Sequence, residues 1–340
     1  MGLSIFSRFL TFLGAAALAT PALGAAPAVS RLQEAGSKAA ACLARDYDGR
    51  AFRDPYLRYV YPEEKLEGTA SDPDLTYRRI DADIMLVLLA REGKIAAALR
   101  PAVDRASRAL HELPPLWAGK GFNNLRKNPE PEGIALDTFC IVGWLEADRA
   151  MAQAAAQALD GDGWLPEGLY EGEESFRRDA DEAWCLRLLA SPAGIGLNDA
   201  RRVLDRLLAD LRDARKDPAG RRSFYAAYHL SLLLEETMDL GSGIDAGALR
   251  EELAEAMAAW AAARPRGREP ASDLLEWANL VTAKLPRLES TGLRRRGVEI
   301  LLRQQGEDGC WHLPGARPPE AGSSFLTLRA LLALSAYRDP

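Results

Sequence analysis

Strongly apolar segments recur along this chain at near-regular intervals. Each begins close to a Ser, an Asp or a small residue and ends in Leu-Leu or a similar pair, and six of them start near residues 81, 136, 179, 223, 272 and 323. Apolar runs of this length, without strand-like alternation between turn residues, predict buried helices. A spacing of roughly 50 residues is typical of repeat architectures built from helical hairpins.

Amphipathic segments lie between the apolar ones. In residues 198–211 and 246–263, apolar side chains recur at helical spacing and charged side chains occupy the opposite face, as expected of helices with one wet face. Further half-exposed helices are expected over residues 30–44 and 147–158, the second after a very short turn. The chain is therefore predicted to be all-α.

The alternation of buried and half-exposed helices predicts a closed ring. An inner barrel of helices inside an outer ring satisfies the pattern, and the two layers together form an α/α toroid of about six hairpins. An open helical solenoid is the alternative, but solenoids usually need polar terminal caps. The last segment, residues 323–334, is as apolar as the middle ones, and this favours closure.

The first 24 residues differ from the rest of the chain. Arg8 is their only charged side chain, and it is followed by an apolar run over residues 9–18 and then by Pro21 and small residues. This order is typical of a secretory signal peptide, and the run is shorter than the ~20 residues that span a membrane. We predict a signal peptide over residues 1–24, a single domain over residues 25–340, and a periplasmic or secreted location.

The charge balance narrows the range of partners. Lys and Arg number 43 and Asp and Glu number 49, so the formal net charge is −6. Proteins that bind nucleic acids carry basic patches, so no nucleic-acid partner is expected, and no stable membrane span is expected either. The short basic runs 221–222 and 294–296 are interpreted as solvated helix faces.

The chain contains four cysteines, Cys42, Cys140, Cys185 and Cys310. No two of them form a C-x-x-C pair, so zinc-ribbon and thioredoxin-like sites have no support. An even number of cysteines in an exported protein permits two disulfides. Buried free thiols are the alternative, because cysteine packs well in apolar cores. The spacing leaves the connectivity open.

One acidic segment has some features of a calcium site. Asp160 and Asp162 alternate with glycines, and Glu167 and Glu171 follow. The spacing differs from that of an EF-hand loop, which needs a third ligand before its Gly. No cofactor is therefore predicted, with calcium kept as a minor alternative.

Residues 296–311 carry a recognisable pattern: a basic residue and Gly, an apolar helix, Gln304-Gln305, and then Gly309-Cys310-Trp311. The pattern resembles the glutamine–tryptophan repeat of squalene–hopene cyclases and related terpene cyclases. A weaker copy, which lacks the residue between Gly and Trp, ends at Trp164. The resemblance implies the α/α-toroid fold shared by terpene cyclases and protein prenyltransferase β-subunits. It also implies a clamp, in which Gln pairs with loop backbone and Trp311 packs over it.

The catalytic and metal-binding motifs of these families have only weaker matches in this chain. Class II terpene cyclases protonate an alkene with an Asp-x-Asp-Asp motif, and the nearest match here, residues 179–182, ends in Glu. Prenyltransferases hold zinc with Asp, Cys and His, but Asp308 and Cys310 belong to the repeat itself, so no metal site is predicted. A terpene cyclase-like or prenyltransferase-like protein stays an alternative, as does a non-catalytic secreted binding module.

Acidic and aromatic side chains gather at the predicted starts of the buried helices, which in a closed ring open on the same end. Asp and Ser are also favoured N-cap residues, so capping is the plain explanation for each one alone. A glycosidase needs two carboxylates, and a lyase needs a base and cations. By analogy with other exported toroids, we predict an enzyme acting on a polysaccharide or oligosaccharide, of glycosidase or lyase type.

The candidate residues for this activity come from those helix starts. The catalytic candidates are Asp83, Asp137, Asp181 and Glu182, with Asp273 and Glu276 as further acids; the substrate-binding candidates are Arg126, Trp184, Tyr225, Tyr228, His229 and Trp277. Arginines and histidine would bind a uronate carboxylate or take part in proton transfer, and tryptophans would stack on a sugar ring.

Overall fold

The computed structural model of the chain describes residues 25–47, 52, 73–91, 96–117, 136–159, 175–197, 200–217, 220–234, 245–267, 269–312 and 323–337. The predicted signal peptide, Arg126, Trp164 and the possible calcium ligands lie outside these ranges. Within them the regular secondary structure is helical and no strand is present. The all-α prediction is confirmed.

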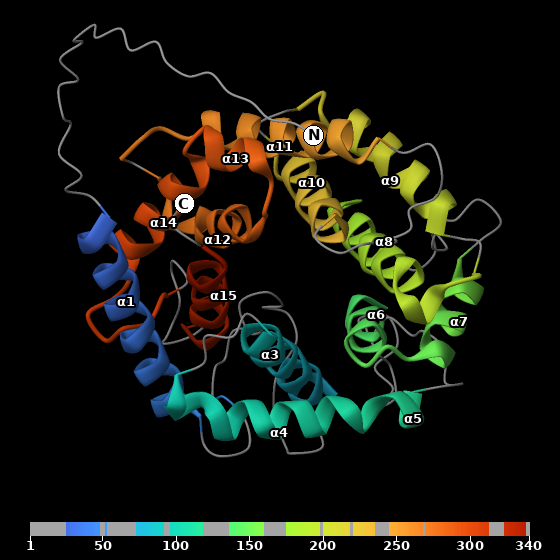
Figure 1. Cartoon of the computed structure of the whole chain (residues 1–340), viewed down its shortest axis with the longest axis horizontal. Coiled ribbons are helices and arrows are strands. Elements are labelled where there is room, and N and C mark those ends of the chain that lie inside the picture. Colours follow the sequence, from blue (N-terminus) through green and yellow to red (C-terminus); the bar gives the residue numbers. More distant parts are fainter. Residues whose placement is uncertain are drawn as a thin grey trace, which may run out of the picture.

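Each apolar segment predicted from the sequence is a helix, and these helices pack side by side in a closed cycle. In cyclic order they are α3 (Pro73–Arg91), α6 (Leu136–Leu145), α8 (Ser175–Ala190), α10 (Arg221–Leu233), α12 (Leu274–Thr282) and α15 (Ser323–Ala336). Each contacts the next, and α15 contacts α3 (Figure 1). The apolar runs are thus buried by one another, as the pattern predicted.

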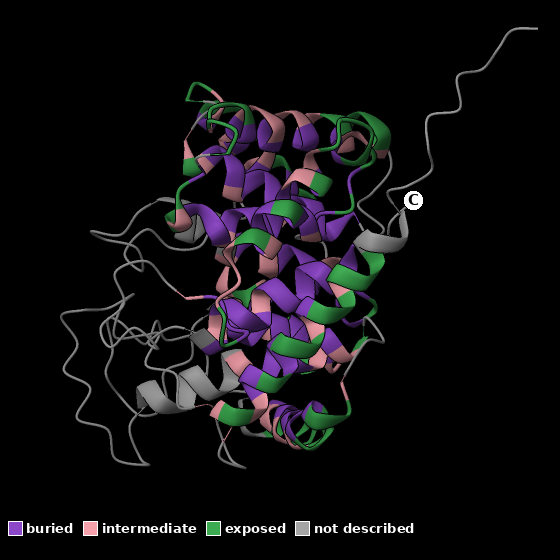
Figure 2. Ribbon diagram, turned by 90° about the vertical axis from the view of Figure 1, so that its left-hand side faces the viewer, coloured by how far each residue is buried: buried purple, intermediate pink, exposed green. Residues whose placement is uncertain are grey.

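A second set of helices lies outside the first (Figure 1). It consists of α1 (Ala25–Asp46), α4 (Arg100–His111), α7 (Arg149–Ala158), α9 (Ala200–Ala214), α11 (Ala246–Ala262) and α14 (Leu293–Gln304), with short helices α5 (Leu113–Trp117) and α13 (Pro286–Ser290) and 3-10 turns η1 (Ala97–Leu99), η3 (Pro192–Gly194) and η4 (Ala271–Asp273). Figure 2 shows their buried residues turned inward and their exposed residues outward. In α9, for example, Val203, Leu207 and Leu211 are buried, whereas Asp205 and Arg212 are exposed.

Two inner helices begin earlier than predicted, which moves their acids into the helix. Helix α3 starts at Pro73 and α8 at Ser175, because polar residues continue the helix before the first apolar one. Asp83 and Asp181 therefore lie well inside their helices, and the expectation that they cap the first turn is wrong. Side-chain caps instead occur on outer helices, where Asp148 accepts from Met151 N (2.8 Å) and Asp245 from Gly247 N (2.9 Å).

The turn between α6 and α7 is as tight as the sequence suggested. Only residues 146–148 separate the two helices. Ala147 reaches this turn with a φ of 51°, a left-handed conformation that a side chain disfavours. The amide of Asp148 closes the turn by donating to Gly143 O (2.8 Å).

The C-terminal repeat fastens α1 to the rest of the ring. A disulfide joins Cys42 of α1 to Cys310, and Nε2 of Gln305 donates to both Ala35 O and Gly309 O at 2.9 Å. Trp311 is fully buried, and its indole Nε1 donates to the carbonyl of residue 301 at 2.8 Å. These contacts match the clamp expected of the repeat, with Gln305 as the pairing glutamine.

Gly309 of this clamp has no room for a side chain. Its φ is 87°, and a Cβ atom there would lie 2.5 Å from the carbonyl oxygen of Lys38. Only glycine combines that conformation with so close an approach to α1. Among the helices described, none is long and apolar enough to span a membrane.

Candidate functional site

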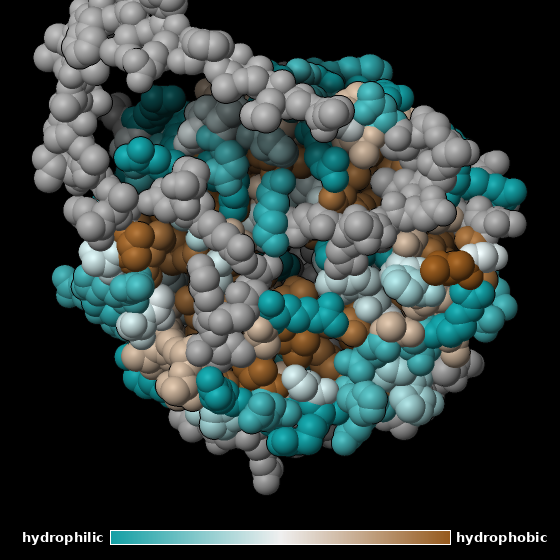
Figure 3. Space-filling model, viewed as in Figure 1, coloured by the Kyte–Doolittle hydropathy of each residue, from teal (hydrophilic) through white to brown (hydrophobic). Residues whose placement is uncertain are grey.

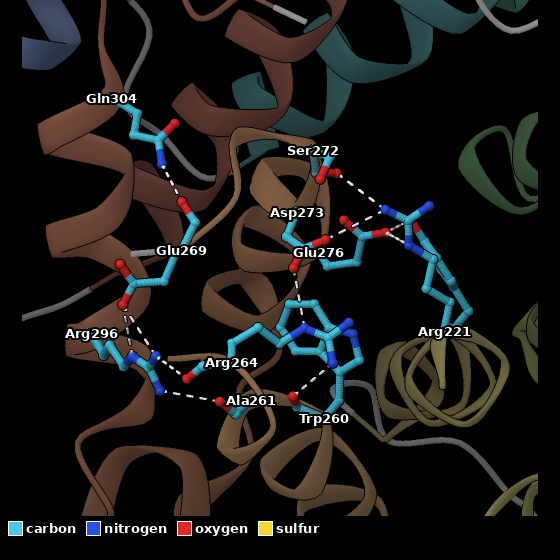
Figure 4. Close-up of polar contacts among 11 residues, drawn as sticks. Arg221, Trp260, Ala261, Arg264, Glu269, Ser272, Asp273, Glu276, Arg296 and Gln304 are labelled. Carbon is cyan, nitrogen blue, oxygen red and sulfur yellow. Dashed lines mark hydrogen bonds and ion pairs between the residues drawn. The ribbon is translucent and has the colours of Figure 1, made fainter. Parts of the chain in front are cut away.

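The starts of α10 and α12 meet in a cluster of acids and arginine (Figure 4), which Tyr225 joins. Arg221, the first residue of α10, lies with Nε 3.1 Å from Oε1 of Glu276 and with Nη2 3.4 Å from Oδ1 of Asp273. The hydroxyl of Tyr225, one turn further along α10, donates to the same Oε1 of Glu276 at 3.1 Å. Arg221 also donates to the carbonyl of Ser272 (3.2 Å). Two carboxylates therefore converge on one guanidinium, and a phenol donates to one of them.

The environment changes the proton affinity of this cluster. Glu276 is buried, and burial raises its pKa despite the opposing effects of Arg221 and the hydrogen bond from Tyr225. Burial also acts to lower the pKa of Arg221, but Glu276, Tyr225 and Asp273 outweigh it and the net pKa is raised. Glu276 is thus a better proton acceptor than an ordinary glutamate, next to an arginine that stays charged.

A second polar network supports the cluster from the outer layer (Figure 4). Arg264 pairs with Asp273 (Nε–Oδ2, 3.1 Å) and donates to Trp260 O (3.0 Å). Glu269 accepts from Arg296 and from Arg303, with nitrogen–oxygen distances of 3.1 and 2.6 Å. This network links α11, α12 and α14, so we assign it a structural role.

His229 continues the row that Arg221 and Tyr225 begin. Its ring stacks on Tyr225 with the centroids 6.2 Å apart, and Trp184 of α8 approaches it edge-on at 6.5 Å. Burial, with a contribution from Arg329, lowers the pKa of His229 to about 3. The imidazole is therefore neutral at physiological pH.

Several buried polar atoms of the inner helices have no hydrogen-bond partner among the described residues. They include Ser223 Oγ, His229 Nδ1, Glu276 Oε2 and Arg329 Nε, on α10, α12 and α15. The indole nitrogens of Trp260 and Trp277 share this property, and those two rings pack together at 5.2 Å. Buried polar groups in folded proteins are nearly always hydrogen-bonded, so such a group of atoms is expected where a polar ligand binds.

Figure 3 shows the ring along its axis. Toward the middle of this face, polar side chains lie next to apolar ones, and grey atoms cover part of the face. A wall of mixed polarity is typical of pockets for small molecules and sugars.

The structure brings some of the predicted site residues together and separates others. Tyr225, His229 and Trp184 form one row, as described above. Asp83 lies elsewhere: it is ion-paired with Arg105 of α4, which also donates to Tyr47 at 2.6 Å. This carboxylate therefore joins an inner helix to an outer one.

The other predicted residues are distributed between core and wall. Asp137 accepts a hydrogen bond from the amide of Thr138 (2.6 Å). The charges of Asp137 and Asp181 both raise the pKa of the Cys140 thiol. Glu182 and Tyr228 are buried, and Trp277 packs against Trp260 in the core.

Two arginines that matter here were not among the predicted site residues. The run 221–222 was interpreted as a solvated face; the Arg221 side chain is indeed 51% exposed, and it also pairs with two buried acids. Arg294 is buried and donates to Val281 O at 2.8 Å, so the solvated-face interpretation is wrong for this residue of run 294–296. A signal did exist: Arg221, Tyr225 and His229 recur every four residues, which places them on one helix face.

Among the described residues, one group of metal-ligand side chains lies close together: Asp308, Cys310 and His312, whose ligand atoms are within 4.8 Å of one another. The sulfur of Cys310 is already bonded to Cys42. His312 Nε2 is 3.1 Å from Oδ2 of Asp308. We therefore treat this group as part of the clamp.

Comparisons with known proteins assign no family to the chain. No protein-family model, no curated protein and no solved structure matches it. The resemblance of residues 296–311 to the terpene cyclase repeat thus stays a prediction from the sequence. What the protein does has to be inferred from the geometry of its own side chains.

Proposed function

We propose that this chain is an exported α/α-toroid enzyme that cleaves an acidic polysaccharide or oligosaccharide inside its ring, by elimination at a uronate residue. The observation that carries the proposal is the Tyr225–Glu276–Arg221 arrangement. It joins a phenol, a buried carboxylate of raised pKa and a cation on two neighbouring inner helices. The closed cycle of inner helices inside an outer layer supports the toroid.

Unpartnered polar atoms on α10, α12 and α15 suit a sugar ligand. Glu276 Oε2 can accept a hydrogen bond, Arg329 Nε can donate one, and Ser223 Oγ can do either; all three atoms are buried and unpartnered among the described residues. A uronate offers hydroxyl donors and a carboxylate acceptor in return. Arg329 would bind the carboxylate, since charge-assisted pairs of guanidinium and carboxylate are the stronger hydrogen bonds.

Elimination needs one proton to be removed and one to be returned. In the proposed step the oxygen of Tyr225 takes the proton from C5 of the uronate while its own hydrogen passes to Glu276. The bond from C4 to the leaving oxygen breaks, a C4–C5 double bond forms, and the dyad returns a proton to that oxygen. The raised pKa of Glu276 assists the first transfer, because a base works best when its pKa is near the working pH. Arg329 would stabilise the negative charge that develops on the carboxylate.

Hydrolysis is a second candidate, favoured by one observation. Asp273 and Glu276 are two carboxylates held by the same guanidinium, and glycosidases use a carboxylate pair of which one is protonated. Burial raises the pKa of Glu276, which would make it the acid, with Asp273 as its partner. The two reactions give different products, so one assay separates them.

The test is a screen of the full mature chain against polyuronates and neutral polysaccharides. Elimination is expected to produce the ultraviolet absorbance of an unsaturated uronate, whereas hydrolysis releases reducing ends without it. Tyr225→Phe should lower the rate by about 100-fold or more, the usual contribution of a general acid–base. Tyr47→Phe is the matched control, because Tyr47 contacts Arg105 outside this cluster.

The outcomes that would contradict the proposal are specific. Cleavage that survives Tyr225→Phe at the rate of the wild type would remove Tyr225 from the reaction. Binding of the polymers without any cleavage, measured by titration calorimetry, would make the chain a binding module instead. Absence of both binding and cleavage across the panel would reject a carbohydrate function.

A further inference from the structure

The two cysteines outside the Cys42–Cys310 disulfide lie in contact with each other. Cys140 is on α6 and Cys185 on α8, both are fully buried, and their sulfur atoms are 3.4 Å apart. These two helices pack side by side in the inner layer (Figure 1). From this juxtaposition we infer that Cys140 and Cys185 form a second disulfide, which cross-links two neighbouring inner helices of the mature protein.

The surrounding packing supports a short bridge at this place. One turn beyond each cysteine, α6 and α8 approach closely: a Cβ atom on Gly143 would lie 3.1 Å from a methyl carbon of Leu188. An S–S bond is about 2.05 Å long, so the sulfurs need to close by roughly 1.3 Å. Small side-chain rotations, with a slight approach of two helices already in contact, supply that movement.

The reaction that forms the bond is thiol–disulfide exchange with a disulfide-carrying oxidant of the export compartment. The thiolate of one cysteine attacks the donor disulfide and forms a mixed disulfide, and the other cysteine displaces the donor's second sulfur. Cys140 and Cys185 lose two protons and two electrons, and the donor becomes a dithiol. The Cys42–Cys310 bond already requires an oxidant of this class, so no further reactant is needed.

The burial of the pair determines when the bond forms. Burial, the neighbouring Cys185 and the carboxylates of Asp181 and Asp137 raise the pKa of the Cys140 thiol well above its ordinary value. The reactive thiolate is therefore scarce in the folded ring, and a reagent would have to reach two side chains with no exposed surface. The bond is thus made during folding, before the inner layer closes, and it resists reduction afterwards.

The test uses the full chain exported to an oxidising compartment with its own leader. The purified protein is denatured and treated with N-ethylmaleimide, with and without prior reduction, and its intact mass is measured. Without reductant no cysteine should be labelled; after reduction all four should be. Peptide mapping should then recover a fragment that links Cys140 to Cys185. Two labels on the unreduced protein, mapped to these residues, would overturn the inference, as would any other pairing.

A pair of variants gives an independent readout. In Cys42→Ala/Cys310→Ala protein, reduction in denaturant followed by refolding in reductant should still lower the melting temperature, by roughly 5 °C for a loop of this size. In Cys140→Ala/Cys185→Ala protein, reduction should lower the melting temperature only by the contribution of the Cys42–Cys310 bond. A melting temperature of the first variant that is unchanged after reduction in denaturant and refolding would contradict the bridge. If either variant fails to fold, the mass and mapping of the wild-type chain decide alone.

Discussion

The hydroxyl of Tyr225 donates to Oε1 of Glu276 over 3.1 Å and so connects inner helix α10 to inner helix α12. The same oxygen is 3.1 Å from Nε of Arg221. One carboxylate oxygen therefore accepts from a phenol and a guanidinium at once, while the second oxygen, Oε2, has no hydrogen-bond partner among the described residues. The Glu276 side chain is thus held firmly through one oxygen and keeps the other as a free hydrogen-bond acceptor. A ligand-binding carboxylate needs both properties.

Glu276 should make stability depend on pH in a defined direction. Burial raises its pKa above the ordinary 4.5, so the folded state holds the proton more tightly than the unfolded chain does. The stabilisation from this group is complete below 4.5 and is lost as pH rises through the raised value. The melting temperature of Glu276→Gln, relative to that of the wild type, should therefore increase between about pH 4 and about pH 8. A relative melting temperature that is constant or falls over this range would show that the folded-state pKa is not raised.

His229 should behave in the opposite way. Burial lowers its pKa from 6.5 to about 3, with Arg329 contributing, so its stabilisation is complete above 6.5 and is lost as pH falls towards 3. NMR should find the imidazole of His229 neutral at about pH 5, where an ordinary histidine is mostly charged. The chain has three histidines, and the His229→Gln variant identifies the signal. A titration midpoint near 6.5 would contradict the buried, neutral state.

Glu269 should contribute far more to stability than a surface acid. Its side chain is 2% exposed and pairs with Arg296 and Arg303, so Glu269→Ala leaves charged groups unpaired and should cost about 3–5 kcal/mol in free energy of unfolding. Glu299 pairs with Arg295 at 3.2 Å but is 56% exposed. Glu299→Ala should cost less than about 1 kcal/mol. Chemical denaturation measures both, and equal losses would show that the Glu269 pairs are not structural.

Ala147 should be a position where glycine stabilises the protein. Its φ of 51° is costly for a residue with a side chain, and Ala147→Gly should raise the free energy of unfolding by about 1 kcal/mol. The same change at Ala209, an exposed position inside α9, should lower it by about 1 kcal/mol, because glycine weakens a helix. If Ala147→Gly and Ala209→Gly both lower the free energy of unfolding by a similar amount, the turn at residues 146–148 is not strained.

Much of the candidate site could have been found from the sequence, but the residues of other helices that contact it could not. Arg221, Tyr225 and His229 share a helix face by their spacing alone. Pairing Tyr225 with Glu276, however, requires knowing which helix lies next to α10 and at what height, and these residues are 51 positions apart. Asp83 shows the converse, since its position near an apolar run suggested the ring mouth and its contact with Arg105 of α4 is structural.

The sequence by itself determined the order, type and approximate bounds of the helices, because hydrophobic periodicity and turn residues act over a few neighbouring positions. The glutamine–tryptophan pattern at residues 296–311 was also recognisable in the sequence, but its contacts with α1 were not. Only the tertiary structure decided that Cys42 pairs with Cys310, that Cys140 lies against Cys185, and that the first arginine of a basic run pairs with two buried acids. These contacts join residues far apart in the chain, and their distances depend on how the helices pack around the whole ring.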